Sequence, residues 1–199
     1  MDVIKNIRQK QVDMSVTEGL LPPVHNPEML LIGCIDARLN ISTDVGIPYG
    51  KALIYRNVAA LISGTKGEDD LGHISEAAAL EFAVNVMKIK DIVVMGHTDC
   101  GGIHACLHGA QGAKHIMEYL APLKAVRNEV SAKGGDVVQM ARAMEQAAVR
   151  QSIANLTTYN AVANAIAEKR LALHGWVIST ATKRISEMDA KTGEFKLMA

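Results

Sequence analysis

The chain of 199 residues is 49% hydrophobic, enough to bury one sizeable core, so we expect a single domain over residues 1–199. Its 21 Lys and Arg residues balance its 21 Asp and Glu residues, which argues against a basic surface for nucleic acid or for a membrane. The apolar runs are also shorter than the roughly 20 residues of a membrane-spanning helix.

The cysteine count and the N-terminal charges indicate a compartment. Asp2, Lys5 and Arg8 leave no room for the apolar core of a signal peptide. Three cysteines without such a signal predict reduced thiols rather than a disulfide framework. We therefore expect a cytoplasmic protein.

The first 20 residues predict a helical arm. Val3, Ile4 and Ile7 recur at helical spacing among polar residues, a pattern that suits a helix packed on another surface. Pro22-Pro23 ends any such helix and starts an extended segment that leads into the first strand.

Two unbroken apolar runs, residues 29–32 and 92–95, predict parallel strands that are covered on both faces. Each run ends at a glycine, where the backbone can turn sharply. Cys34 follows the first strand, and His97 and Cys100 follow the second. The carboxyl ends of parallel strands form the edge where open α/β sheets usually place their chemistry.

The remaining segments complete an alternating pattern of strands and helices. We expect a strand at 52–55, helices at 73–88, 113–130, 135–149 and 151–169, a final strand at a sheet edge at 173–179, and a hairpin of 184–188 with 194–197. Strand, helix, strand in this order is a right-handed crossover unit. The expected fold is therefore α/β, with a central, mainly parallel sheet flanked by helices and an N-terminal helical arm.

Cys34, His97 and Cys100 have the softness of zinc ligands, and His-x-x-Cys supplies two of them from one turn. Three protein ligands rather than four is the catalytic number, because the fourth position stays open for water or substrate. The alternative is that both cysteines are small buried hydrophobic residues at strand ends. The third cysteine, Cys106, has no partner in either motif and is expected to be buried on a helix.

These motifs resemble those of the β-class carbonic anhydrases over nearly the whole chain: Cys34-x-Asp36-x-Arg38, Arg56-Asn57 and Gly96-His97-Thr98-x-Cys100-Gly101-Gly102. The resemblance implies a zinc enzyme that reversibly hydrates carbon dioxide to bicarbonate by a zinc-bound hydroxide. It also implies a homodimer or a higher even oligomer, with the N-terminal arm on the partner subunit; an ordinary docked terminal helix is the alternative for this segment.

The resemblance also assigns residue roles. Asp36 and Arg38 form a catalytic pair in which the carboxylate orients the zinc-bound hydroxyl, or closes the site by binding zinc itself when it is released. Arg56 fixes the loops around the metal cleft and the subunit interface. The expected substrate-binding residues are His25, Leu53, Phe82, Gly101 and Gly102.

The chain departs from the family pattern at some of these positions. His25 stands where the family commonly has a glutamine, and a neutral imidazole can donate a hydrogen bond in its place. Leu53 and Phe82 occupy positions that are often aromatic, so half of that lining is aliphatic here. We expect Gly101 and Gly102 to let the backbone approach the metal closely.

Other interpretations remain open. The same zinc hydroxide could hydrolyse carbon disulfide or carbonyl sulfide, or the chain could be a zinc-binding regulatory protein without turnover. Intact Asp36 and Arg38 speak against the second. Asp99 is expected to face solvent or to cap the loop. Three nearby histidines are expected at the surface, with a proton relay as the alternative: His104, His108 and His115.

Overall fold

The computed structural model describes residues 3–4, 7–8, 25–67 and 70–198. Within the predicted arm at residues 1–20, it therefore describes only Val3, Ile4, Ile7 and Arg8, which are helical and exposed. The rest of the arm lies outside the described residues, so its position on a partner subunit stays a prediction.

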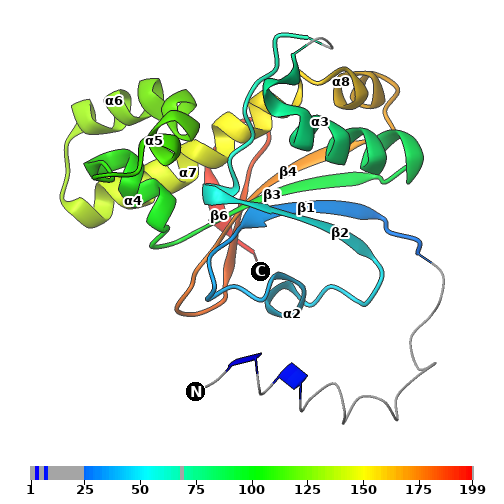
Figure 1. Cartoon of the computed structure of the whole chain (residues 1–199), viewed down its shortest axis with the longest axis horizontal. Coiled ribbons are helices and arrows are strands. Elements are labelled where there is room, and N and C mark those ends of the chain that lie inside the picture. The colour runs from blue at the N-terminus through cyan, green and yellow to red at the C-terminus, as the bar shows by residue number, and fades with distance from the viewer. Residues whose placement is uncertain (1–2, 5–6, 9–24, 68–69, 199) are drawn as a thin grey trace.

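In the described part of the chain, a six-stranded sheet has the strand order β2-β1-β3-β4-β5-β6 (Figure 1). The strands are β1 (Met29–Cys34), β2 (Ala52–Asn57), β3 (Asp91–His97), β4 (Ala172–Ile178), β5 (Ile185–Met188) and β6 (Phe195–Leu197). Strands β1 to β4 run parallel, and β5 and β6 are antiparallel to their neighbours. The expected α/β fold with a central, mainly parallel sheet is confirmed.

The placement of the strand predicted at 173–179 at a sheet edge is wrong. This strand, β4, pairs with β3 on one side and with β5 on the other. The predicted hairpin of β5 and β6 is confirmed, and it extends the sheet beyond β4. Its turn is closed by Asp189, whose carboxylate accepts two backbone N–H bonds from Lys191 and Thr192.

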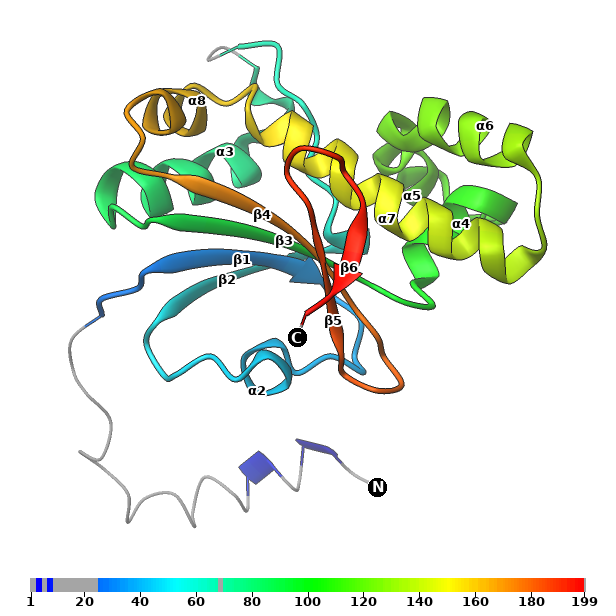
Figure 2. The same cartoon turned by 180° about the vertical axis from the view of Figure 1, so that it is seen from behind.

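Helices cover both faces of the sheet (Figures 1 and 2). Helices α3 (Ile74–Glu81) and α8 (Asn160–Ala167) lie on one face, and α2 (Ile41–Val45) lies on the other. A group formed by α4 (Gly101–His108), α5 (Lys114–Tyr119) and α6 (Lys124–Lys133) lies beyond the carboxyl ends of the parallel strands. Helix α7 (Val137–Leu156) runs from this group across the sheet toward α8. No helix in the described ranges combines the length and the apolar composition needed to cross a bilayer.

The helix boundary expected between residues 149 and 151 is wrong, because α7 continues to Leu156. The helix begins at a capping box, in which Asp136 and Gln139 each bond the backbone N–H of the other. It ends where the hydroxyls of Thr157 and Thr158 donate to backbone carbonyls three residues earlier. Such local side-chain bonds compete with continuation of the helix.

Two other predicted helices are interrupted. The one expected at 113–130 is divided by a 3₁₀ turn (Ala121–Leu123) that contains Pro122, whose ring nitrogen has no proton to donate. The one expected at 73–88 starts with a short 3₁₀ turn (Leu71–His73), continues as α3, and then widens into a π-helical segment (Phe82–Val86).

The core forms two clusters, one on each face of the sheet. Because side chains alternate along a strand, Leu31 of β1 belongs to one cluster and Ile32 to the other. Helix α7 contributes to both, with Met144 in the first cluster and Leu156 in the second. This helix therefore joins the two halves of the core.

We predict that Met144→Ala lowers the free energy of unfolding by about 2–5 kcal/mol, the usual loss for truncating a large core side chain. Met144 is 0% exposed, whereas Val138, on the same helix, is 62% exposed. Val138→Ala is therefore the matched control and should change the free energy by less than about 0.5 kcal/mol. Urea unfolding at a fixed protein concentration measures both, and equal losses would contradict this account of α7.

Candidate metal centre

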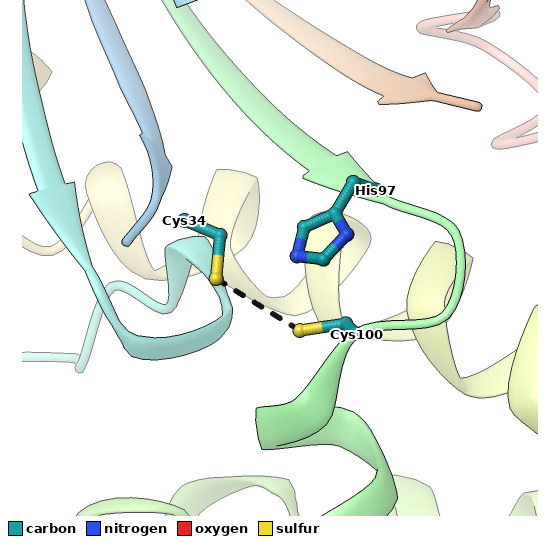
Figure 3. Close-up of side chains that lie close together, drawn as sticks. All are labelled: Cys34, His97 and Cys100. Carbon is teal, nitrogen blue, oxygen red and sulfur yellow. Dashed lines mark hydrogen bonds between the residues drawn. The ribbon is translucent and has the colours of Figure 1, made fainter. Parts of the chain in front are cut away.

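The three predicted ligands come together where strands β1 and β3 end (Figure 3). Cys34 is the last residue of β1, His97 is the last residue of β3, and Cys100 is the N-cap of α4. Their ligand atoms all lie within 4.8 Å of one another, and all three residues are buried. The two sulfur atoms are 4.0 Å apart, which is too far for a disulfide.

The distance between the sulfur atoms of Cys34 and Cys100 can be compared with the distance expected in a zinc site. Two sulfurs bound at about 2.3 Å in a tetrahedron, as zinc binds them, lie about 3.8 Å apart. The separation of 4.0 Å between the sulfurs of Cys34 and Cys100 is close to this value. The two thiols are therefore placed for a metal ion of this size.

One ring nitrogen of His97, Nε2, faces the two sulfur atoms and is free to bind a ligand. Its Nδ1 lies 2.9 Å from the carbonyl oxygen of Thr98, and a carbonyl only accepts, so Nδ1 carries the proton. Nε2 is then left with a lone pair, and this buried atom has no hydrogen-bond partner within residues 25–67 and 70–198 or the other described positions. A buried acceptor without a partner is unfavourable unless a cation or a ligand binds it.

The sulfur atoms of Cys34 and Cys100 lie within hydrogen-bonding distance, and either thiol can be the donor of the shared proton. This contact lowers the pKa of Cys34 to about 4. The same contact with Cys34, together with burial, raises the pKa of Cys100. The backbone N–H groups of Gly102 and Ile103, at the start of α4, act in the opposite direction and favour the Cys100 thiolate. Both thiolates form together only where a cation replaces the shared proton, as a coordinated metal does.

Asp36 and Arg38 form the expected pair. The Arg38 Nε donates to Asp36 Oδ1 at 2.9 Å, and a terminal guanidinium nitrogen donates to Oδ2 at 2.7 Å. This bidentate contact holds the pKa of Asp36 well below its usual range. Asp36 Oδ2 lies 3.8 Å from Nε2 of His97, so the paired carboxylate borders the ligand atoms. The expectation that Asp36, when released from Arg38, binds the metal and closes the site stays a prediction.

Arg56 holds the first metal loop through its backbone. Its guanidinium donates to the carbonyl oxygens of Cys34 and Asp36, each at 2.8 Å. The predicted bracing of the loops around the cleft is therefore present in the geometry. Its part in a subunit interface stays a prediction.

Of the two glycines after Cys100, only Gly102 is tightly surrounded. A Cβ at Gly102 would come within 2.7 Å of Val58 Cγ1 and 3.1 Å of the Ala59 Cβ, whereas one at Gly101 would meet nothing within 4 Å. The expected close approach of the backbone is thus made by Gly102 against the 3₁₀ turn Val58–Ala60, rather than against the metal site. That turn also supplies the N–H of Ala59, which favours the Cys34 thiolate. The substrate-binding role of both glycines stays a prediction.

The neighbouring polar residues are mostly exposed. The Asp99 side chain is 58% exposed, which agrees with the expected solvent-facing loop residue. Cys106 is buried on α4, as expected, and burial raises its pKa. The three histidines after the second motif are all exposed: His104, His108 and His115. Their possible service as a proton relay stays a prediction.

The structure adds two residues that the sequence reasoning missed. Glu145 is only 3% exposed and accepts the backbone N–H of Asp99 at 2.7 Å. Arg142, one turn earlier on α7, donates to both carboxylate oxygens of Glu145. Burial raises the pKa of Glu145 even though Arg142 opposes this shift. One sequence feature could have identified Glu145: it is a glutamate on the apolar face of the predicted helix, directly after Met144, which is fully buried.

The other predicted substrate residues lie apart from this centre. His25 is exposed in the segment that leads into β1, Leu53 is half-buried on β2, and Phe82 is 45% exposed on the π-helical segment. Strand β1 has six residues and separates His25 from Cys34, which is a distance of about 20 Å at roughly 3.3 Å per residue. His25 therefore cannot reach the metal ligands of its own chain, and the roles of all three stay predictions.

Fold and site together define a class: an α/β protein with a buried set of two cysteines and one histidine at the carboxyl edge of a parallel sheet. The family model for carbonic anhydrase matches residues 29–185. Carbonic anhydrase 1 of Escherichia coli O157:H7 is 31% identical over 87% of this chain and 79% of its own length.

Two further relatives extend the comparison. The mitochondrial β carbonic anhydrase 6 of Arabidopsis thaliana is 29% identical over 86% of this chain, which spans 60% of that relative's length. A tetrameric β-carbonic anhydrase of the ascomycete Sordaria macrospora has a similar structure, with a TM-score of 0.82 and 27% identity over 96% of this chain and 98% of that one. The chain belongs to the β-class carbonic anhydrase family.

We predict that Cys34→Ser and Cys100→Ser each lose bound metal, because a serine hydroxyl is a poor ligand for a soft metal site. Cys106→Ser is the matched control, since Cys106 is also a buried cysteine but lies outside the cluster. Elemental analysis of purified protein should give about one metal per chain for the native protein and for the control. Full metal content in Cys34→Ser and Cys100→Ser would contradict the assignment of the ligands.

Proposed function

We propose that this protein is a zinc-dependent carbonic anhydrase, which interconverts carbon dioxide and bicarbonate. The observation that carries the proposal is the buried cluster of Cys34, His97 and Cys100 beside the Asp36–Arg38 pair. Membership of the β-class family supports the reaction, and the soft donor set supports zinc as the metal.

Zinc held by these three residues would supply a Lewis acid that makes water nucleophilic at mildly alkaline pH, because two thiolates leave the ion with little net charge. The protein holds the ligand atoms in place before binding. His97 is fixed in the tautomer that leaves Nε2 free, and the start of α4 favours the thiolate of Cys100. Burial of all three residues keeps bulk water from competing for these atoms.

Asp36 orients the nucleophile. Because Arg38 keeps its carboxylate ionised, Asp36 can only accept a hydrogen bond and cannot donate one. Oδ2, at 3.8 Å from His97 Nε2, is placed to accept a hydrogen bond from a water or hydroxide beside the ligand atoms. That hydrogen bond would fix the orientation of the oxygen that attacks carbon dioxide.

We predict that Asp36→Asn lowers kcat/KM for carbon dioxide hydration by about 10- to 100-fold while metal content is kept, because the amide turns a donor toward Arg38 and disturbs the pair. Asp136→Asn is the matched control, since asparagine caps a helix about as well as aspartate. Stopped-flow hydration and metal analysis measure both variants.

An Asp36→Asn variant with native rates and full metal would show that the carboxylate does not orient the nucleophile. The same preparations should be tested with carbonyl sulfide and carbon disulfide. Faster turnover of either sulfur compound by the native protein would favour the alternative hydrolase activity.

We also infer a homodimer or a higher even oligomer. Strand β2 is one of the two outer strands of the described sheet, and Ile54 on it is 39% exposed. His25 lies at the far end of β1 from its own metal site, so it serves a substrate pocket only if a second chain brings it there. The tetrameric relative from Sordaria macrospora supports such an assembly.

We also propose that the protein is located in the cytoplasm, because its free cysteines suit a reducing compartment.

We predict that His25→Ala lowers carbon dioxide hydration about tenfold, the loss of one hydrogen bond of about 1.4 kcal/mol to the substrate. His25→Gln should keep most of the activity, because an amide also donates. His73→Ala, at a half-buried histidine that has no proposed role in the reaction, is the control. Sedimentation should show the native protein as a dimer or larger at micromolar concentration. Unchanged kinetics in His25→Ala, or a fully active monomer, would contradict the shared pocket.

A further inference from the structure

Glu145 is a buried carboxylate whose hydrogen bonds go to the backbone of the second metal loop, residues 98–100. Its Oε1 accepts the N–H of Asp99 at 2.7 Å and that of the ligand Cys100 at 3.4 Å. The side chain is 2% exposed, so these contacts are shielded from solvent. Helix α7, which carries Glu145, is thus joined directly to the loop between His97 and Cys100.

Arg142 completes this connection on the outer side of the loop. One guanidinium nitrogen donates to both oxygens of Glu145, at 3.0 and 2.9 Å. The other terminal nitrogen donates to Asp99 Oδ1 at 2.8 Å. Asp99 has a φ of 58°, a left-handed conformation that is uncommon for residues other than glycine and is held here by contacts on both its backbone and its side chain.

The same loop reaches the catalytic pair. A terminal nitrogen of Arg38 donates to the carbonyl oxygen of Asp99 at 2.8 Å while it also binds Asp36. The orientation of the Arg38 guanidinium therefore depends on where the Asp99 carbonyl lies. A continuous set of contacts runs from α7 through Asp99 and Arg38 to Asp36.

Stability alone does not account for a charged pair in this position. A buried ion pair contributes little net stability, and apolar residues of similar size often replace it without loss. Glu145 follows Met144, which is fully buried, so an apolar side chain would suit the core here. An apolar residue, however, cannot accept hydrogen bonds from the backbone N–H groups of Asp99 and Cys100.

We propose that Arg142 and Glu145 are positioning residues, which hold the loop that carries His97 and Cys100 and, through Asp99, fix the Arg38 guanidinium that orients Asp36. The proposal rests on the proposed function only in taking Cys34, His97 and Cys100 as metal ligands. Without Arg142, the Glu145 carboxylate is left buried without its cation, and Asp99 loses the contact that holds its side chain. The loop then moves more freely, and its ligands release metal faster.

Arg142→Met tests the proposal, because Arg142 is 36% exposed and its removal leaves the core intact. Arg150→Met is the matched control: Arg150 lies on the same helix, but it donates to the backbone carbonyl of Gly193 in the C-terminal hairpin rather than to the metal loop. The rate at which a chromogenic chelator removes zinc from each loaded protein is the main measurement. We expect about a 10- to 100-fold faster loss in Arg142→Met and native behaviour in Arg150→Met.

A second readout separates positioning from a general loss of structure. Circular dichroism in urea-free buffer should show both variants folded, although Arg142→Met should unfold at a lower urea concentration because Glu145 loses its cation. The kcat should fall in Arg142→Met with KM for carbon dioxide little changed. Metal loss at the native rate in Arg142→Met, or equally fast loss in Arg150→Met, would overturn the proposal. Because metal release is measured without carbon dioxide, an inactive native protein that binds zinc would overturn the proposed function and leave this inference standing.

Discussion

Strands β1 and β3 are direct neighbours in the sheet, and their parallel register sets the position of the metal centre. Gly33 pairs with Met95, so the last residue of β1 and the last residues of β3 come to the same edge. Gly96 has no side chain, and a Cβ there would lie 2.8 Å from Val149 Cγ2 of α7. The helix therefore packs closely against the strand end. Glu145 is one helical turn before Val149, which brings it within reach of the loop that follows His97.

The centre is assembled from groups that are unfavourable without a cation. Two buried sulfurs lie in hydrogen-bonding contact, and Nε2 of His97 is a buried atom without a hydrogen-bond partner among the residues that the structure describes. Binding a metal relieves both conditions, so part of the binding free energy stabilises the folded state. The surrounding contacts keep these groups together before the metal arrives, which is the arrangement expected of a site built for binding rather than for stability.

Much of the fold and the ligand set follow from local sequence patterns. The apolar runs before Cys34 and His97 have strand length, and the ligands stand directly at their ends, so both were predictable. Glu145 and Arg142 were not, because they are more than 40 residues from the loop that they contact, and only tertiary packing brings them there. The internal position of β4 was missed for a different reason: the hairpin was predicted, but its first strand, β5, is short and only half-buried, and nothing in its sequence indicates that it pairs with β4.

The charges around the first metal loop explain why its shape does not depend on Asp36 alone. Arg56 donates to the carbonyls of Cys34 and Asp36, and Lys183 donates to the carbonyl of Arg38. These cations bind backbone oxygens, so the loop stays in place whichever group the Asp36 carboxylate contacts.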